Sequence, residues 1–376
     1  MAEWITTNLE ECTDVLGDGL HGTPKYTERG EYAFVNGNNL VDGEILIKKE
    51  TKRVDYSQYE KYKKPLTDRT ILVSINGTLG NVGIYDSEKI ILGKSACFFN
   101  VKESVDKDFI YYIVSSPAFK QYLESNATGT TIKNISLKQM RKYTFSLPQI
   151  SEQKRISSVL RRIDEKIKNN RAIDKNLEQQ VSVLYQSWFE DFEITNGVCP
   201  EDWSYQELSS ITDIASGKRP PVKSNVCNQE TPISIVGAAS VMGFTSEANH
   251  TDKILVTGRV GTHGVVQRFN TPCWTSDNTL VITSPYYEFT NQILHRIDYS
   301  TMNRGSTQPL ITQGDMKKVV VLVPDENTLA KFEEFAGSLM VKWEANNKEN
   351  VKLASLRDTL LPKLMSGELD VSKIDI

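Results

Sequence analysis

The sequence predicts an α+β fold: two similar sheet-containing domains joined by two long antiparallel helices that form a coiled coil, with pseudo-twofold symmetry. The first observation behind this prediction is a repeat, because the segment from Gly129 to Pro148 recurs from Gly305 to Pro324 with both ends shifted by 176 residues. The second observation is that each copy leads into a helical heptad pattern that keeps this shift. A chain repeated once in this way suits a partner that is itself nearly twofold.

The first domain is expected over residues 1–150 and the second over residues 194–325. Each contains short apolar and β-branched runs separated by Gly, Asn and Pro turns, a pattern typical of strands. A short helix is expected at Phe109–Ser115. The expected strands are Ile45–Ile47, Ile71–Ile75, Ile90–Leu92, Val265–Phe269, Thr279–Thr283 and Val319–Val323.

A second internal match supports the repetition of whole domains. The run Ile71-Leu72-Val73 is followed by Gly77-Thr78-Leu79-Gly80, and Ile254-Leu255-Val256 is followed by Gly261-Thr262-His263-Gly264. We therefore expect the same strand and the same glycine-containing turn in both domains.

Two long helices are expected, one over residues 151–193 and one within residues 326–376. Ser151 is the expected N-cap of the first helix, and Pro362 should end or kink the second. Steps of four and three between apolar positions predict a coiled-coil seam along each helix. The first seam consists of Ile156, Leu160, Ile163, Ile167, Asn170, Asp174, Leu177, Val181, Leu184 and Trp188. The second consists of Phe332, Ala336, Leu339, Trp343, Asn346, Asn350, Leu353, Arg357, Leu360 and Leu364.

Both seams become polar at their centres. If the helices pack antiparallel, Asn170 and Asp174 face Asn346 and Asn350. Such a polar layer costs stability but fixes register and orientation. At about 1.5 Å per residue, a helix of about 35 residues is roughly 50 Å long, enough to hold two domains at a fixed separation. The alternative is that each helix only caps its own domain.

The composition limits the possible classes of protein. No apolar run reaches the roughly 18 residues of a membrane helix, and no export signal is recognisable, so a cytoplasmic location is expected. The five cysteines and four histidines are scattered, which gives neither a disulfide framework nor a metal site. The formal net charge is −4, so a surface for nucleic acid must come from local clusters of cations.

Four patterns found in enzymes occur only in incomplete form. Gly17–Gly22 fits a dinucleotide-binding motif but is followed by Thr23-Pro24 in place of a helix. Gly93-Lys94-Ser95 lacks the first glycine of a phosphate-binding loop, and Ser284–Tyr287 lacks the second proline of a methyltransferase motif. The nuclease-like spacing of Asp42 and Glu50–Lys52 lacks its leading Pro-Asp. The chain is therefore expected to be non-catalytic.

The indication of nucleic-acid binding comes from local clusters. Residues 48–64 interleave lysines and an arginine with three tyrosines, and a second basic cluster spans residues 218–223. Cations neutralise phosphates, whereas Arg, His and amide side chains can also read base edges. The alternative is that these clusters are ordinary solvated loops. The candidate DNA-binding residues are Lys25, Lys48, Lys49, Lys52, Arg53, Lys61, Lys63, Lys64, Lys218, Arg219, Lys223, Arg259, His263 and Arg268.

Four segments resemble the specificity (S) subunit of type I restriction–modification systems. They are Gly17–Tyr26, the Gly-[Ser/Thr]-Thr to Leu-Pro or Val-Pro ending of both domains, Glu152–Ile156 at the start of the first helix, and Leu356–Leu369. The resemblance spans the whole chain. It departs at Asp325–Thr328, which replaces the Glu-Gln-Lys opening in the second copy.

The resemblance implies two target-recognition domains, each reading one half of a bipartite DNA site, with helices that set the spacer and dock methyltransferase (M) subunits. It implies double-stranded DNA, two M subunits and two restriction (R) subunits as partners. S-adenosylmethionine, ATP and Mg²⁺ are then expected on the partner subunits, with no cofactor bound by this chain. Two other hypotheses remain at this stage: a two-lobed scaffold that binds only protein, and a self-contained nuclease or methyltransferase.

Overall fold

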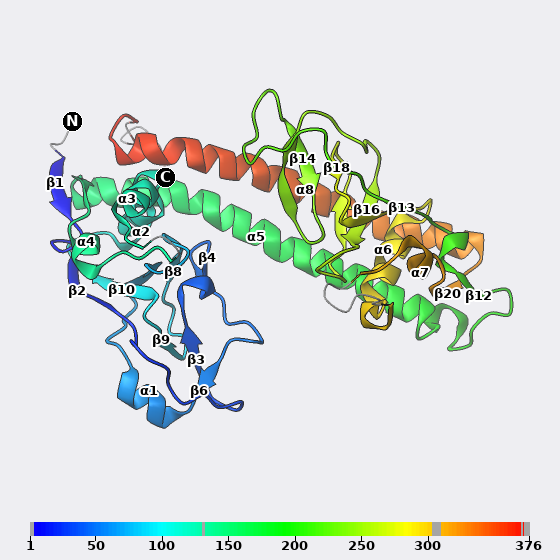
Figure 1. Cartoon of the computed structure of the whole chain (residues 1–376), viewed down its shortest axis with the longest axis horizontal. Coiled ribbons are helices and arrows are strands. Elements are labelled where there is room, and N and C mark those ends of the chain that lie inside the picture. Colours follow the sequence, from blue (N-terminus) through cyan, green and yellow to red (C-terminus); the bar gives the residue numbers. More distant parts are fainter. Residues whose placement is uncertain (1–3, 130–131, 303–309, 370, 372–376) are drawn as a thin grey trace. The chain divides into compact units, whose positions relative to one another are not determined.

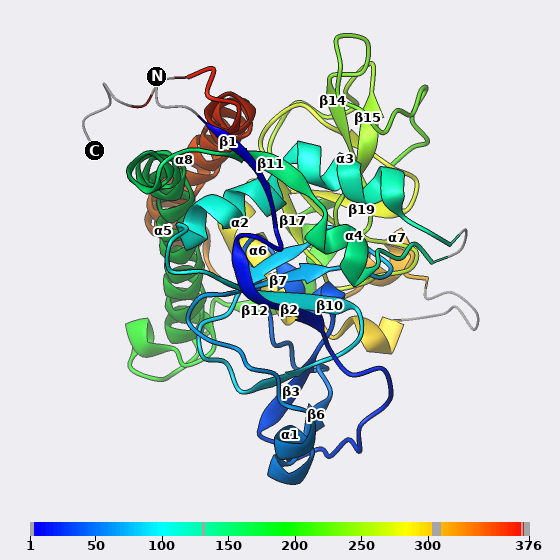
Figure 2. The same cartoon turned by 90° about the vertical axis from the view of Figure 1, so that its left-hand side faces the viewer.

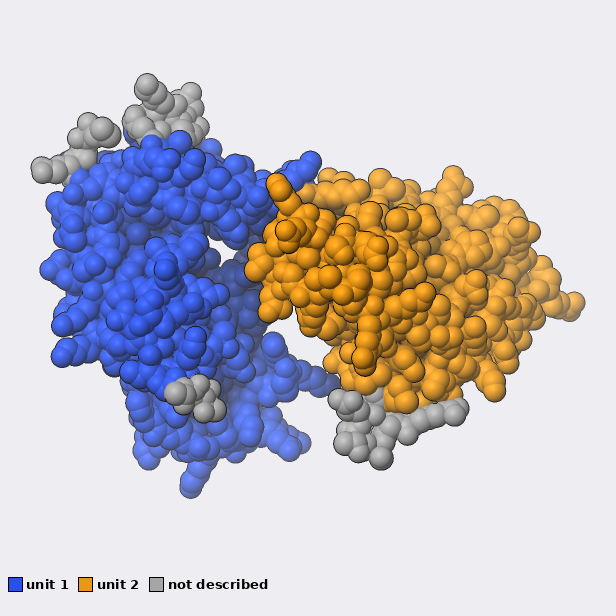
Figure 3. Space-filling model, turned by 45° about the horizontal axis from the view of Figure 1, so that its top comes forward, with its two compact units in different colours: residues 1–169, 349–376 blue, residues 170–348 orange. Residues whose placement is uncertain are grey.

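A computed structural model describes residues 4–129, 132–302, 310–369 and 371 (Figure 1). The repeated segments at Thr130-Thr131 and Gly305–Thr307 lie outside the described residues. The chain divides into two compact units: unit 1 comprises residues 1–169 and 349–376, and unit 2 comprises residues 170–348 (Figure 3). Each unit therefore contains part of both long helices. The expected domains, residues 1–150 and 194–325, contained neither helix.

Unit 1 is organised around a four-stranded sheet in the order β2-β10-β7-β8, beside a three-stranded sheet in the order β6-β3-β9. Two further strand pairs, β1-β11 and β4-β5, complete it. Its strands are β1 Ile5–Asn8, β2 Thr13–Asp18, β3 Tyr32–Val35, β4 Leu40–Val41, β5 Glu44–Ile45, β6 Arg53–Val54, β7 Thr70–Ser74, β8 Val82–Ile84, β9 Ile90–Leu92, β10 Ala96–Val101 and β11 Thr144–Leu147. Its short helices are α1 Tyr56–Tyr62, α2 Lys107–Ser115, α3 Pro117–Asn126 and α4 Leu137–Arg141.

The core of unit 1 forms because its central strands are apolar on both faces. Every residue of β7 and β10 is buried, and Phe99 packs in the same cluster as Phe109 of α2 and Phe119 of α3. Figure 2 shows α2 and α3 on one side of strands β7 and β10. Burying each such ring contributes on the order of 2 kcal/mol. Asp106 and Ser116 begin α2 and α3 by accepting hydrogen bonds from the backbone of the first turn, which satisfies donors that a helix start leaves open.

Unit 2 repeats this plan. Its four-stranded sheet has the order β13-β19-β16-β17, with a three-stranded sheet β15-β14-β18 and the pair β12-β20. Its strands are β12 Ser204–Glu207, β13 Asp213–Ser216, β14 Ile233–Val236, β15 Val241–Thr245, β16 Ile254–Gly258, β17 Gln267–Phe269, β18 Trp274–Thr275, β19 Thr279–Thr283 and β20 Val320–Val323. Its short helices are α6 Tyr287–Arg296 and α7 Gln313–Lys317.

The predicted repeat is confirmed at the level of strand pairing. Each unit contains one parallel strand pair, β3-β9 in unit 1 and β14-β18 in unit 2. The predicted glycine turns also match, because Gly77 and Gly80 after β7, and Gly261 and Gly264 after β16, all have positive φ angles. A side chain at these positions would be strained, which explains why glycine recurs with the same spacing.

Most of the expected short elements are confirmed within a residue or two. The exceptions are Ile45–Ile47, where only Ile45 lies in a strand, and Val265–Phe269, where the strand begins at Gln267. Leu46 and Ile47 are exposed, so their apolar character does not indicate a buried strand.

The two long helices have equal lengths and occupy equivalent positions in the repeat. Helix α5 spans Ile150–Phe189 and α8 spans Glu326–Met365, each 40 residues long, with both ends shifted by 176. The prediction of Ser151 as N-cap is wrong, because the helix already begins at Ile150 and Gln149 accepts the first backbone hydrogen bonds. Of the two outcomes predicted for Pro362, an end of the helix is wrong, because α8 continues to Met365, with buried Leu361 and Leu364 on either side of the proline, and a kink stays a prediction.

Every position of both predicted seams is buried or half-buried. In unit 1, Ile156 and Leu160 share a core with Leu361 and Leu364, and Arg357 donates to Asp164 at 2.8 Å. In unit 2, residues of α5 from Val181 to Phe189 pack with Phe332, Ala336 and Met340 of α8. In unit 1 the start of α5 meets the end of α8, and in unit 2 the end of α5 meets the start of α8, so the helices pair antiparallel.

Candidate nucleic-acid interface

Unit 1 gathers most of its candidate cations beside the three-stranded sheet. We call basic surface 1 the predicted residues that flank β6 and α1. Among these, Arg53 and Lys64 are half-buried and the others are exposed. The set consists of Lys25, Lys48, Lys49, Lys52, Arg53, Lys61, Lys63 and Lys64. The structure therefore brings together cations that the sequence spreads over 40 positions, as binding to a phosphate backbone requires.

Tyrosines hold several of these lysines in place. The Lys52 ammonium lies 4.8 Å from the ring centre of Tyr26, and that of Lys61 lies 5.1 Å from the ring centre of Tyr62. Tyr59 stacks on Tyr32 of β3 at 4.1 Å, which fixes α1 against the sheet. An ammonium over a ring face keeps its hydrogens available to other acceptors, so these lysines are held in position and can still donate hydrogen bonds to a phosphate.

One lysine of basic surface 1 has a carboxylate partner. Lys63 forms an ion pair with Glu60 at 2.8 Å, and this hydrogen bond raises the pKa of Lys63 and lowers that of Glu60. Both side chains are well exposed, so the pair is weakly held and Lys63 can exchange Glu60 for a phosphate.

A cavity of about 270 Å³ lies within basic surface 1. Tyr26 and Phe34 form aromatic walls, while three asparagines from the 3₁₀ turn Gly37–Asn39 and its preceding residue supply amides. Asn39 is committed to the fold, because it donates to the carbonyl of Leu46 at 2.9 Å, whereas Asn38 is exposed. None of these three asparagines is among the DNA-binding residues predicted from the sequence. The run Asn36–Asn39 could have indicated them, because it marks a turn rich in groups that can read base edges.

The second basic cluster lies on the surface of unit 2. Lys218, Arg219 and Lys223 are exposed. Arg219 pairs with Asp277 at 2.9 Å, but its side chain is 88% exposed, so this ion pair contributes little. The backbone carbonyl of Lys218 accepts a hydrogen bond from the indole of Trp274 at 2.7 Å, which anchors the cluster to β18.

The third predicted patch divides into two environments. Arg259 and His263 are half-buried near the turn at Gly261: Arg259 approaches the carbonyl of Asp277 at 3.5 Å, and His263 approaches that of Gly258 at 3.2 Å. Arg268, in contrast, forms a buried ion pair with Glu288 at 2.6 Å, and its side chain is only 10% exposed. We therefore leave Arg268 out of the proposed interface, because its charge is neutralised inside unit 2.

Within the described parts of the chain, no three His, Cys, Asp or Glu side chains gather as a metal site would require. Burial raises the pKa of Cys273 to about 11, which keeps this thiol protonated near neutral pH. Among the described residues, none of the helices combines the length and apolar character that crossing a membrane requires.

Comparison with known proteins shows what the chain is similar to. The family model for the type I restriction modification DNA specificity domain matches residues 1–179. The MjaIX specificity subunit of Methanocaldococcus jannaschii is 24% identical, with 99% of this chain and 95% of that protein covered. The HindI specificity subunit of Haemophilus influenzae is 19% identical over 70% of this chain and 77% of that protein.

A solved structure supports the fold. The S subunit of a type I restriction–modification system from M. genitalium has a TM-score of 0.58 and 20% identity, with 97% of this chain and 96% of that chain covered. The MjaIX subunit and the M. genitalium structure match this chain almost end to end, across both units and both long helices. The chain is therefore similar over its whole length to specificity subunits of type I restriction–modification systems, and residues 1–179 match the model of their DNA specificity domain.

Proposed function

We propose that this chain is the sequence-specific DNA-recognition subunit of a type I restriction–modification complex. Unit 1 and unit 2 each read one half of a bipartite site through their sheet-containing parts. The observation that carries this proposal is the repetition of one strand topology, with exposed cations beside it in both copies. Subunits of this family are non-catalytic, so the chain supplies the address and its partners perform the chemistry.

We assign two different roles to the cations. Lysines of basic surface 1 and of the 218–223 cluster neutralise phosphates, which fixes the protein on the duplex without reading sequence. Arg259, His263 and the amides around Asn38 have donor and acceptor groups suited to base edges, so they select the half-sites. The scaffold hypothesis would need neither class of residue.

The paired helices are the proposed element that sets the spacer and docks the partners. Apolar side chains lie exposed on both helices away from the seam: Val183 is 65% exposed, Val341 65% and Val351 72%. Exposed apolar residues on a helix surface suit a protein partner. We propose that two M subunits bind there and that two R subunits join the complex. S-adenosylmethionine, ATP and Mg²⁺ are then bound by those partners, in the cytoplasm.

The direct test is DNA binding by the full chain together with its M subunit. Fluorescence anisotropy with the methylated target duplex, and with duplexes in which either half-site is scrambled, separates the two units. Scrambling either half-site should weaken binding by at least tenfold, and raising the salt concentration should weaken binding to all duplexes. Equal binding to the target and to both scrambled duplexes would refute the proposal.

A further inference from the structure

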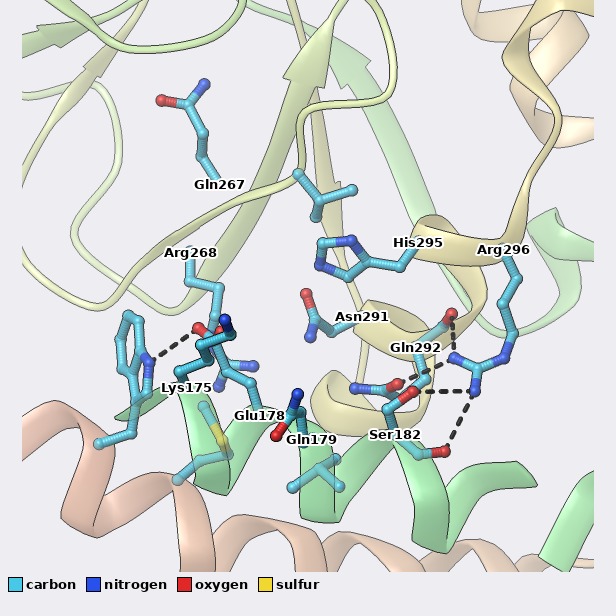
Figure 4. A pocket seen from close by; sticks show the side chains of 14 residues that line it. Lys175, Glu178, Gln179, Ser182, Gln267, Arg268, Asn291, Gln292, His295 and Arg296 are labelled. Atoms are coloured by element: carbon cyan, nitrogen blue, oxygen red, sulfur yellow. Dashed lines mark hydrogen bonds between the residues drawn. The ribbon is translucent and has the colours of Figure 1, made fainter. Parts of the chain in front are cut away.

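Unit 2 contains a cavity of about 690 Å³ that the proposed function does not use. It is lined by side chains from α5, α6, α8 and the β17 region (Figure 4). Its volume lies in the range of ordinary small-molecule sites. Lys175, Gln179 and Ser182 follow one another along one face of α5 and line its side, opposite residues of α6.

The cavity is lined by the cations Lys175, Arg268 and Arg296 and by the carboxylate of Glu178. Lys175 is exposed at its edge and makes no ion pair with any residue that the structure describes. Arg268 and Arg296 also line it, each held in place by a carboxylate, Glu288 and Glu190, at 2.6 Å. Burial and the charges of both arginines lower the pKa of His295, which points into the same space. Lys175 is therefore the lining cation without a carboxylate partner among the described residues, and it is the group that can attract an anion.

An unsatisfied polar group points to a ligand. Asn291 is only 5% exposed, lines the cavity, and its Oδ1 accepts no hydrogen bond from the described residues. Figure 4 shows this side chain extending from α6 toward α5. Leaving a buried amide oxygen without a donor is unfavourable, so a ligand that supplies an N–H there gains affinity.

One wall of the cavity is flat and apolar. The indole of Trp343 is fixed by its hydrogen bond to Glu178 at 2.9 Å, and the guanidinium of Arg268 lies 5.4 Å from its ring centre. Val181 and Met340 extend the apolar surface. Such a wall suits a planar ring, because two flat surfaces can stack and bury apolar area between them.

The chemistry of the cavity is not part of the repeat. With the shift of 176, Lys175 corresponds to Val351, Gln179 to Ser355, and Trp343 to Ile167. Arg268 pairs with Leu255 across β16 and β17, where the equivalent pair in unit 1 places Gly83. A role shared by both units, such as reading DNA, does not account for a site that the sequence builds only once.

We propose that this cavity binds a small molecule of the nucleotide class. Its planar ring lies against the Trp343 wall, a ring N–H donates to Asn291 Oδ1, and its phosphate is attracted by Lys175. This inference goes beyond DNA recognition and does not depend on it.

The test is calorimetric titration of the full chain with adenosine monophosphate, adenosine and inorganic phosphate. Adenosine monophosphate should bind saturably at one site, with adenosine and phosphate each at least tenfold weaker. Lys175→Gln should weaken binding at least fivefold. Lys331→Gln, an exposed position of α8 outside the cavity, should leave binding unchanged. Asn291→Leu should also weaken binding, with circular dichroism to confirm folding and Gln179→Ala as the second variant if it does not fold.

Three results would overturn the proposal. The first is no saturable binding of adenosine monophosphate. The second is binding that neither Lys175→Gln nor the Asn291 and Gln179 variants alter. The third is displacement of the nucleotide by an equimolar DNA duplex, which would show that the cavity takes a phosphate of DNA in place of a free nucleotide.

Discussion

The amide of Asn346 on α8 donates to Asp174 on α5 at 2.7 Å, in the polar centre of the seam. Asn347 donates to the other carboxylate oxygen at 3.1 Å. Asp174 and Asn346 are 7% and 1% exposed, and burial raises the pKa of the Asp174 carboxyl. A buried carboxylate is tolerated only with donors on its oxygens, so this contact selects the helix register that supplies them.

Removing the donor should therefore be costly. Asn346→Leu leaves the carboxylate of Asp174 with a single donor and should reduce the free energy of unfolding by about 1–3 kcal/mol. The double variant Asp174→Leu, Asn346→Leu should recover most of this loss, because no polar group is then left unpaired. Urea unfolding of the full chain measures both. A double variant no more stable than the single one would contradict this account.

Substitutions of the proposed phosphate-binding and base-reading residues should affect DNA binding differently. Lys61→Ala should weaken binding similarly on all sequences and reduce the slope of log affinity against log salt by about 0.9. Arg259→Ala or His263→Ala should instead relax the choice of bases in one half-site. Competition binding against scrambled half-sites separates the two outcomes. If Lys61→Ala altered base choice, the division into phosphate and base contacts would be wrong.

Arg268 provides a stability counterpart to these variants. Arg268→Ala leaves Glu288 buried without its partner and should destabilise the protein by about 3–5 kcal/mol. At temperatures where the Arg268→Ala variant is folded, it should prefer the same half-site bases as the original protein. Thermal unfolding and methylation mapping test the two statements. A stable variant with altered target bases would return Arg268 to the interface.

Glu333 should make the stability of unit 2 depend on pH. Burial raises the pKa of its carboxyl from 4.5 to about 7, despite hydrogen bonds from the backbone N–H groups of Glu288 and Phe289. The folded state therefore holds this proton more tightly than the unfolded state does. The stability that Glu333 contributes is fully present below pH 4.5 and is lost as the pH rises toward 7.

Glu333→Gln should flatten this part of the stability profile, measured by urea unfolding between pH 4.5 and 7.5. The neighbouring exposed residue offers a matched control, so Glu334→Gln should leave the profile unchanged. A profile in Glu333→Gln that still falls with the original slope would assign the dependence to another group.

The spacer hypothesis makes a quantitative prediction. Adding one turn of four residues to both helices lengthens each by about 6 Å. At about 3.4 Å per base pair, the spacer of the recognised site should grow by at most about two base pairs, with both half-sites unchanged. Methylation mapping reads out spacer and half-sites together. Changed half-site bases with the original spacer would argue against the helices as the measuring element.

The helix seam could be predicted because its information is local. A step of four and three fixes which side chains of α5 face α8, and the shift of 176 carries the result to the second copy. The pairing of Asp174 with Asn346 followed from antiparallel packing and is confirmed. Asn347 was not predicted to join it, because it lies beside the seam and reaches Asp174 only through its side-chain length.

The candidate interface was less predictable because surface position depends on contacts distant in sequence. Arg268 and Arg219 have the same charge, yet one pairs with Glu288 inside unit 2 and the other is exposed. The sequence pattern cannot tell which arginine is buried, because the partner of Arg268 is 20 residues away on α6. The cavity beside Asn38 was missed for the same reason: its walls come from β3, a 3₁₀ turn and a loop.

The central claim is that each unit reads its own half-site, as the repeat within the chain predicts for a target that is itself nearly twofold. The most direct measurement replaces residues 204–323 with a second copy of residues 5–147, the segments from β12 to β20 and from β1 to β11. Single-molecule sequencing of adenine methylation in cells carrying this chain and its M subunit reads the new target. The account predicts an inverted repeat of the first half-site with the original spacer. Persistence of the original second half-site would contradict it.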